Sequence, residues 1–201
     1  MRFASYLMGI ALLLSAAVGQ AAEILRDGDI IFHTSRSAQS LAVQRATRSP
    51  FSHMGLVFHR HGRPFVLEAI ATVRYTPLED WIARGDDGKY VVRRLKAGLT
   101  AEHASNLRLA AEKYRGRPYD PYFEWSDALI YCSELVWKAY RNALGIEIGA
   151  RQKLREFDVG DALVKAKMRE RYGGRVPLDE TVISPAAMFG SALLVTVDRK
   201  D

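Results

Sequence analysis

The order of hydrophobic and polar residues along this chain predicts a series of short strands and helices. Apolar runs bounded by turn residues are typical of strands, and apolar residues three or four positions apart are typical of helices. The strongest helical patterns cover residues 100–114 and 133–144, and the second ends at Gly145. We expect further strands at 29–33, 54–59, 64–70, 89–95 and 193–197, and further helices at 37–47, at 76–82 and over most of 151–172. This order predicts an α+β fold in which a mostly antiparallel sheet packs against helices.

Local signals mark where two of these helices begin. Ser37 is the candidate N-cap of the first helix, because a serine hydroxyl accepts hydrogen bonds from the free amides of a first turn. Thr76 is the candidate N-cap of the 76–82 helix, with Pro77 at the first helical position and Glu79 completing a capping box. Residues 182–186 contain a Ser-Pro pair and are expected to form a turn.

The two strands at 54–59 and 64–70 are expected to form a hairpin, because a short glycine-containing segment joins them. A four-residue loop from His59 to Gly62 would pair Phe58 with Arg63 and, further along, His53 with Glu68. Residues paired in this way have Cβ atoms about 4.5–5.5 Å apart, so Glu68 would lie within reach of His53. A carboxylate in so apolar a strand is costly unless it has such a partner.

The first 21 residues have the composition of a secretory signal. Arg2 precedes an apolar stretch over 6–18, and small residues then suit cleavage after Ala21, with cleavage after Ala22 nearly as suitable. An uncleaved anchor is disfavoured, because the apolar stretch is shorter than the roughly 20 residues that span a bilayer. We therefore expect export to the periplasm or cell envelope, and one domain over 22–201 without a membrane span.

Composition narrows the choice of partners. The formal net charge is +6, and it becomes +5 when Arg2 leaves with the signal, so an anionic partner such as an acidic peptide, an acidic glycan or a lipid headgroup suits the chain. Nucleic acid is not expected, because the basic residues are dispersed rather than interleaved with aromatic ones. The sequence has no zinc-ligand spacing and no phosphate-binding glycine loop, so we expect no metal and no cofactor. It does not indicate an oligomeric state.

Cys132 is the only cysteine in the chain, which is unusual for an exported protein. It stands at the start of the helix expected over 133–144, where free amides and the helix dipole favour a thiolate. His53 is the best-placed base among the five histidines. With Glu68 to orient it, the three residues supply the nucleophile, base and orienting group of a papain-like triad. The alternative is a buried structural thiol that acts as a small hydrophobic residue.

Short motifs along nearly the whole mature chain place the histidine and glutamate before the cysteine, the reverse of the order in papain. The early motifs are Gly28-Asp29-Ile30-Ile31-Phe32, Ser52-His53-Met54-Gly55-Leu56-Val57 and Leu67-Glu68-Ala69. The later motifs are Gly116-Arg117-Pro118-Tyr119-Asp120, Phe123-Glu124-Trp125, Tyr131-Cys132-Ser133-Glu134-Leu135-Val136 and Ile183-Ser184-Pro185. In combination they resemble the motifs of the circularly permuted papain-like proteins, the YiiX-like relatives of the NlpC cell-wall peptidases.

The resemblance implies a permuted papain-like, NlpC-type fold with Cys132 as nucleophile, His53 as base and Glu68 as orienting residue. It implies a thiol-dependent hydrolase that cleaves amide bonds in cell-wall-derived peptides, such as peptidoglycan fragments, or in other small peptides. A lipid-directed acyltransferase or thioesterase could use the same triad on an acyl substrate. A binding module that keeps the fold without turnover is a third interpretation.

Residues around the cysteine are candidates for substrate binding. Tyr119 and Asp120 precede it in a loop rich in aromatic residues, and they either line the substrate pocket or only shape the loop. Tyr131 is either a pocket wall or a core residue. Helical geometry points Glu134 away from the site, where its charge would offset the positive end of the helix dipole.

Overall fold

A six-stranded sheet forms the centre of the computed structural model, which describes residues 24–201. The predicted signal and its cleavage site near Ala21 lie outside these residues. The strand order is β4-β3-β2-β1-β5-β8, and every neighbouring pair is antiparallel. The strands are β1 Ile30–His33, β2 His53–Arg60, β3 Arg63–Ala69, β4 Val73–Pro77, β5 Tyr90–Leu95 and β8 Leu194–Lys200. With the helices described next, the sheet confirms the expected α+β class.

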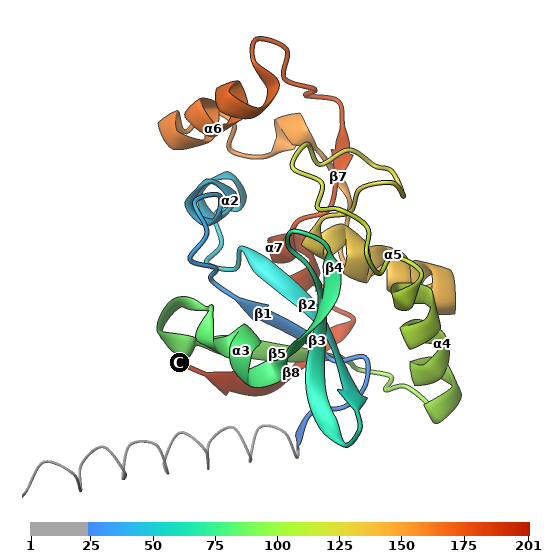
Figure 1. The fold of residues 1–201 in the computed structure, drawn as a ribbon. Coiled ribbons are helices and arrows are strands. Elements are labelled where there is room, and N and C mark those ends of the chain that lie inside the picture. Colours follow the sequence, from blue (N-terminus) through green and yellow to red (C-terminus); the bar gives the residue numbers. More distant parts are fainter. Residues whose placement is uncertain (1–23) are drawn as a thin grey trace, which may run out of the picture.

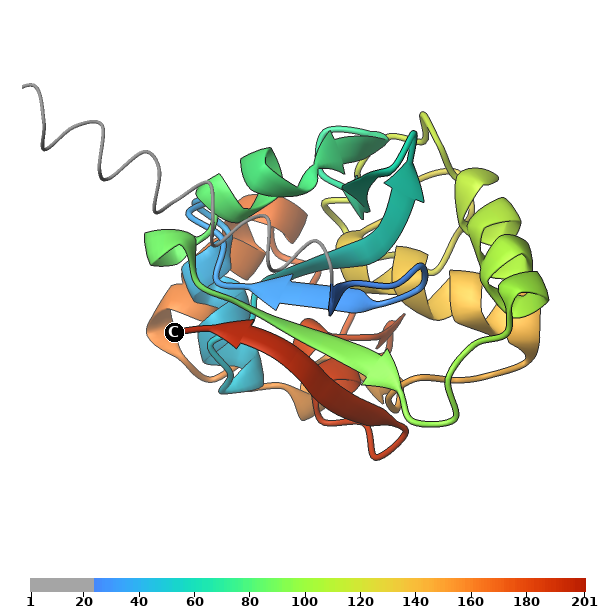
Figure 2. The same ribbon diagram turned by 90° about the horizontal axis from the view of Figure 1, so that it is seen from below.

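Helices cover both faces of the sheet and one of its ends. They are α2 Ser40–Thr47, α3 Leu78–Ala83, α4 Ala101–Glu112, α5 Cys132–Leu144, α6 Ala162–Tyr172 and α7 Pro185–Phe189. Figures 1 and 2 show α4 and α5 lying together beside the sheet, and residues of α5 and α7 pack against the strands in one core. Because α3 packs against the opposite face, the sheet is buried on both sides.

Side chains of the central strands point alternately to the two faces of the sheet and contribute to two hydrophobic cores. In β1, Ile30 and Phe32 face the α5 side, whereas Ile31 faces α3. In β2, Leu56 and Val57 divide in the same way. Strands buried on both faces read as continuous apolar runs, which is the pattern seen in the sequence. A polar residue in such a strand is therefore enclosed wherever it points.

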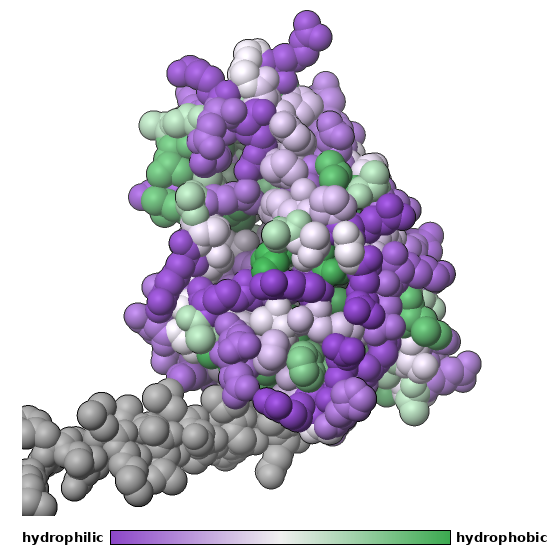
Figure 3. Space-filling view, in the orientation of Figure 1, coloured by the Kyte–Doolittle hydropathy of each residue, from purple (hydrophilic) through white to green (hydrophobic). Residues whose placement is uncertain are grey.

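A smaller lobe lies beyond one end of the sheet (Figure 1). It contains α2, α6 and a two-stranded pairing of β6 Gln152–Lys153 with β7 Thr181–Val182. Figure 3 shows hydrophobic side chains near α2 and α6 on this side, and Leu41 and Leu163 are exposed there. Among residues 24–201, no helix is both long enough and apolar enough to cross a bilayer.

The expected hairpin is present, but its register was predicted wrongly. The loop contains only His61 and Gly62, and the pairing brings Phe58 opposite Phe65 rather than Arg63. Both loop residues have positive φ, 50° and 73°, as a two-residue turn of the type that suits hairpin twist requires. The strands are therefore shifted by two residues relative to the prediction. A shift of two keeps every side chain on its expected face, because the strand period is two.

Several local predictions were also wrong. Helix α2 begins at Ser40 without a side-chain cap, so Ser37 does not cap it. Thr76 and Pro77 end a strand, β4, that the sequence did not suggest, and α3 has no side-chain cap. Only the second part of 151–172 is an α-helix, and the expected turn at 182–186 contains the end of β7 and the start of α7.

The two strongest helical predictions are confirmed. Thr100 caps α4 by accepting a hydrogen bond from the backbone N–H of His103, at 3.1 Å. Helix α5 ends at Gly145, whose φ of 69° places it in the left-handed region that favours glycine. The start of α5 at Cys132 is the feature that positions the candidate nucleophile.

Candidate active site

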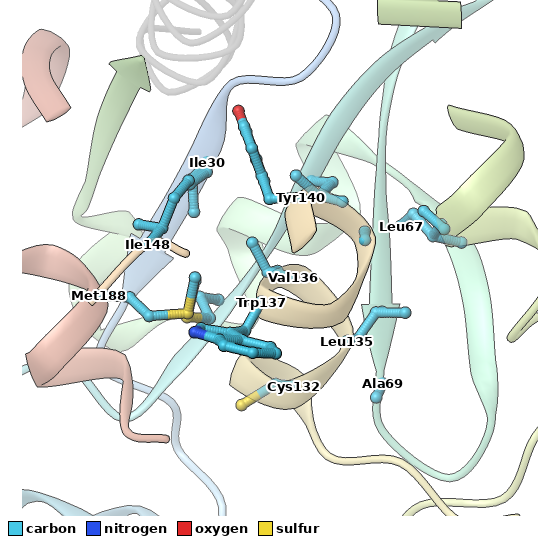
Figure 4. Close-up of a cluster of buried hydrophobic side chains, with 14 of the residues drawn as sticks. Ile30, Leu67, Ala69, Cys132, Leu135, Val136, Trp137, Tyr140, Ile148 and Met188 are labelled. Carbon is cyan, nitrogen blue, oxygen red and sulfur yellow. The ribbon is translucent and has the colours of Figure 1, made fainter. Parts of the chain in front are cut away.

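Cys132 is the first residue of α5, and its residue surface is 6% exposed. Leu135, Val136 and Tyr140 of the same helix are fully buried against the sheet and fix the helix in place. In Figure 4 the sulfur lies at the end of the helix and points away from this cluster of apolar side chains. First-turn amides have no partners within a helix, so this end of α5 favours negative charge on the sulfur.

His53 begins β2 and is hydrogen-bonded to Glu68 of β3, with 2.7 Å between Nε2 and Oε2. The predicted contact is therefore present, although the two residues are not direct partners. Gly55 stands opposite Glu68 when the register is continued one step, and a Cβ added to it would lie 3.3 Å from the Glu68 Cβ. Because Gly55 has no side chain, the Glu68 carboxylate can extend across β2 to His53.

Glu68 is fully buried and is held from three sides. Its Oε1 accepts a hydrogen bond from the Thr76 hydroxyl at 2.6 Å and a short one from the Arg84 guanidinium. Burial alone would raise the pKa of Glu68, but the bonds to His53, Thr76 and Arg84 outweigh it and lower that pKa. The carboxylate thus stays ionised beside His53. Thr76 serves this carboxylate rather than capping α3.

Burial opposes the charged form of His53, but interactions with Cys132 and Glu68 reverse the effect. Together they raise the pKa of His53 from 6.5 to about 9. Since Nε2 is occupied by Glu68, the other ring nitrogen, Nδ1, is the one left for the thiol. The site therefore favours an imidazolium beside the sulfur at neutral pH, which is the charge state that a thiolate–imidazolium pair requires.

His33 is a second histidine close to the site. It ends β1 directly opposite His53, and its ring stacks on Trp81 with centroids 3.9 Å apart. Burial, together with the positive charges of His53 and Arg84, lowers the pKa of His33 to about 2. His33 is therefore neutral, and of these two histidines His53 is the one that can carry a proton. The two histidines are neighbours because β1 pairs with β2 in a register that places His33 opposite His53.

Two cavities that share part of their walls border this site. A cleft of about 580 Å³ is lined by His33, His53, Arg36 and Arg84. A narrower pocket of about 80 Å³ is lined by Cys132 together with apolar residues. Tyr119 lines both cavities, and Tyr131 lines the narrower one.

The expected substrate-binding residues therefore differ in their positions. Tyr119 lies on a wall that the cleft and the pocket share. Tyr131 is both a pocket wall and a core residue, since it is 2% exposed and belongs to the buried cluster. Asp120 lines neither cavity. It is fully buried, and its Oδ1 accepts the Tyr122 backbone N–H at 2.8 Å, which fits the alternative that it shapes the loop.

Glu134 is buried rather than solvated. It is 0% exposed, its carboxylate pairs with Lys138 at 2.8 Å, and it accepts the Tyr131 backbone N–H at 3.4 Å. Burial raises the pKa of Glu134 to about 8, against the opposing effect of Lys138. Lys138 also donates to the backbone oxygen of Ser126 at 2.6 Å. The pair therefore ties the loop to α5 rather than only balancing the helix dipole.

Replacing Gly55 with alanine should separate Glu68 from His53. The new Cβ would lie 2.5 Å from Val66 and 2.8 Å from the Leu67 carbonyl, so the strands must move apart. We expect a loss of about 1–3 kcal/mol in the free energy of unfolding, measured in urea. We also expect iodoacetamide to alkylate Cys132 more slowly than in the wild type. Gly174→Ala is the control, because a Cβ there meets nothing within 4 Å. A Gly55→Ala protein with unchanged stability and labelling would contradict this account.

Comparison with known proteins identifies relatives of this chain. The model of the family described as permuted papain-like amidase enzymes, YaeF/YiiX, C92 family, matches residues 24–197. The uncharacterized protein YiiX of Escherichia coli K12 is 52% identical over 173 residues, which cover 86% of each chain. A crystal structure of metalloprotein yiiX from Escherichia coli O157:H7 is also 52% identical. It aligns with a TM-score of 0.86 over 87% of this chain and 97% of its own.

The match spans the sheet, the helices and all three candidate residues. It agrees with the order seen in the structure, in which histidine and glutamate on adjacent strands precede a cysteine at a helix start. The chain belongs to the YaeF/YiiX family of permuted papain-like amidases.

Proposed function

We propose that this protein is a thiol-dependent amidase that uses Cys132, His53 and Glu68 as its catalytic triad. The observation that carries the proposal is the 2.7 Å bond between His53 and a fully buried carboxylate, beside a cysteine at the start of a helix. Such an arrangement activates a thiol through a base that a third group orients. The family description supports amide hydrolysis in general.

The proposed reaction has two stages. The Cys132 thiolate adds to the amide carbonyl carbon, and the C–N bond then breaks while His53 gives its proton to the leaving amine. Neutral His53 next takes a proton from water, the resulting hydroxide attacks the thioester, and the acid is released with the thiol restored. Throughout, Glu68 keeps the imidazole ring in one orientation and stabilises its charged form.

We propose an acidic peptide as the substrate, derived from the cell wall, and export to the periplasm or envelope after cleavage near Ala21. The larger cleft supports this choice, because its charged lining residues are Arg36, Arg84 and the His53 imidazolium, with no carboxylate in the lining. A cleft lined by one sign of charge attracts the opposite charge. It lies on the His53 side of the site, so it would hold the leaving amine and an anionic group attached to it.

A second candidate function follows from the narrower pocket. Its lining beside Cys132 is mostly apolar and includes Val43, Phe123, Leu154 and Phe157, which suits an acyl chain. A lipid-directed acyltransferase or thioesterase could use the same triad there. Release of a primary amine from acidic peptides would favour the amidase, and release of a fatty acid from acyl esters would favour the second candidate.

The solved relative from Escherichia coli O157:H7 is named a metalloprotein, so the fit of this chain to a metal matters. Among residues 24–201, no group of three or more His, Cys, Asp or Glu side chains is arranged to hold a metal ion. At the candidate site, the oxygens of Glu68 already accept bonds from His53, Thr76 and Arg84. The residues do not fit a metal, and no step of the proposed reaction involves one.

Alkylation of Cys132 by iodoacetamide tests the proposal without a known substrate. An ordinary thiol with a pKa of about 8.5 is roughly 0.3% thiolate at pH 6, whereas a thiolate–imidazolium pair is fully ionised. A pre-ionised thiolate is a weaker nucleophile, so we expect alkylation at pH 6 to be roughly 10- to 100-fold faster in the wild type than in His53→Ala. The rates would be measured on the protein without residues 1–21.

The exposed residue His103 on α4 provides a matched control, and His103→Ala should be alkylated at the wild-type rate. If Cys132 reacts only after the protein unfolds, the thiol is structural and the amidase proposal fails. The interpretation of the protein as a binding module that keeps the fold without turnover would then take its place.

A further inference from the structure

Tyr119 stands next to the candidate nucleophile, and the triad leaves its hydroxyl without a role. It lines both the larger cleft and the narrower pocket that contains Cys132. The charge of Cys132 also contributes to the pKa of Tyr119, as expected for close neighbours. The phenol therefore lies on a wall that the two cavities share, one of which contains the Cys132 sulfur.

The hydroxyl of Tyr119 has a defined direction because its oxygen already accepts a hydrogen bond. The Gln39 side-chain amide donates to it, with 2.9 Å between Nε2 and the oxygen. The tyrosine proton is consequently left to point away from Gln39, and Tyr119 borders both cavities. Burial raises the pKa of Tyr119 well above its usual range, so the proton stays on the phenol wherever the enzyme would work.

Gln39 is in turn held by Arg171 of α6. The Arg171 guanidinium donates to Gln39 Oε1 at 2.6 Å. Because an arginine can only donate, it fixes which end of the amide is the carbonyl and presents the NH₂ group to Tyr119. A chain of hydrogen bonds thus runs from the smaller lobe, through Gln39 at the start of α2, to the wall of the site.

We propose that Tyr119 is a further catalytic residue, whose hydroxyl donates a hydrogen bond to the oxyanion formed when Cys132 attacks, and that Gln39 and Arg171 are positioning residues. In that step the C–S bond forms and the carbonyl π electrons move onto oxygen. Tyr119 keeps its proton, and when the C–N bond breaks the amine takes its proton from His53. Free amides in the first turn of α5 provide a second source of donors. The inference rests on the proposed function, since it needs Cys132 to act as a nucleophile.

Two electrophiles separate this role from the activation of the thiol. Acylation by p-nitrophenyl acetate passes through an oxyanion, whereas alkylation by iodoacetamide displaces iodide and forms none. Removing one oxyanion donor typically lowers a rate by about 10²–10³, and an activated ester should show a smaller effect. We expect Tyr119→Phe to lower the acylation rate at least tenfold and to change the alkylation rate by less than about threefold.

Gln39→Glu is the sharpest test of the positioning residues, because it has nearly the same shape. A carboxylate there would keep its contact with Arg171, but it would accept from Tyr119 and draw the phenolic proton away from the site. Acylation should fall about as far as in Tyr119→Phe. Arg171→Met should lower it less, and Arg169→Met, an exposed position on the same helix, should leave it unchanged.

The outcomes distinguish the two proposals. A wild-type protein that iodoacetamide does not alkylate in the folded state would refute the proposed function. Normal alkylation combined with wild-type acylation in Tyr119→Phe, or in Gln39→Glu, would overturn the role of Tyr119 and leave the triad standing. Equal losses in both reactions would mean that the phenol supports the fold of the site rather than the oxyanion. Thermal melting of each variant shows whether it is folded.

Discussion

Replacing Cys132 with serine should lower amide hydrolysis by about 10³-fold or more and leave the fold intact. Serine differs from cysteine by one atom, so the packing at the start of α5 is preserved. A hydroxyl, however, cannot be held as an anion by the His53 imidazolium at neutral pH, whereas a thiol can. The measurement is release of primary amine from short peptides rich in glutamate or aspartate, with purified protein lacking residues 1–21. Ser105→Ala, at an exposed position on α4, should retain the wild-type rate.

The variant that carries both Cys132→Ser and His53→Ala tests whether the two residues act together. If Cys132 and His53 act as one unit, His53→Ala should cost about as much as Cys132→Ser, and both changes together should cost little more. Residual activity would then come from substrate binding and the oxyanion donors. Losses that multiply in the double variant, or turnover that persists in Cys132→Ser, would show that the hydrolysis does not use this thiol.

Features of the site that depend on local sequence could be predicted well. The start of α5 at Cys132 and its end at Gly145 follow from apolar spacing and a glycine stop. The contact between His53 and Glu68 was predicted from the hairpin register that the loop length suggested, and the cost of a carboxylate in an apolar strand supported it. It held although the loop length was wrong, because a two-residue shift keeps both side chains on one face. The two-residue turn was missed because it places His61 at positive φ, which is uncommon for a residue other than glycine.

Features that depend on distant contacts could not be predicted in this way. The motif at Thr76 reads locally as a helix cap, but the buried Glu68 carboxylate takes the hydroxyl as a donor instead. Arg84 and Gln39 reach the site from the end of α3 and the start of α2, where sequence periodicity gives no direction. Glu134 is buried, and its partner Lys138 is bonded to Ser126 in the loop before Cys132. In each case tertiary structure decided what a local pattern left open.

Replacing Glu68 with glutamine should lower kcat/KM by about 10²-fold or more. The amide has nearly the same shape, but it removes the negative charge that stabilises the His53 imidazolium and offers His53 a donor as well as an acceptor. The wrong ring tautomer then becomes accessible, and a base held in the wrong tautomer cannot serve the nucleophile. The measurement is the pH profile of kcat/KM. Its alkaline limb should lie near pH 9 in the wild type, where His53 loses its proton, and should move towards 6.5 in the variant.

Stability should change with pH in a related way. The pKa of His53 is raised from 6.5 to about 9 in the folded protein. The contribution of His53 to the free energy of unfolding is therefore fully present below pH 6.5 and is lost as the pH rises to 9. The pKa of Glu68 is lowered, so its contribution is present above the usual value of about 4.3 and is lost as the pH falls below it. The difference in the free energy of unfolding between wild type and Glu68→Gln should therefore be largest from about pH 5 to 6.5, at about 1–3 kcal/mol.

Glu79 provides the matched control, because it pairs with Arg63 at 3.1 Å while both side chains are more than half exposed. Glu79→Gln should cost less than about 1 kcal/mol, since exposed ion pairs contribute little, and it should leave the pH profile of kcat/KM unchanged. If Glu68→Gln keeps an alkaline limb near pH 9 and loses no more stability than Glu79→Gln, the carboxylate does not orient His53. The buried bond between them would then be a structural contact, and another group would have to hold the imidazole.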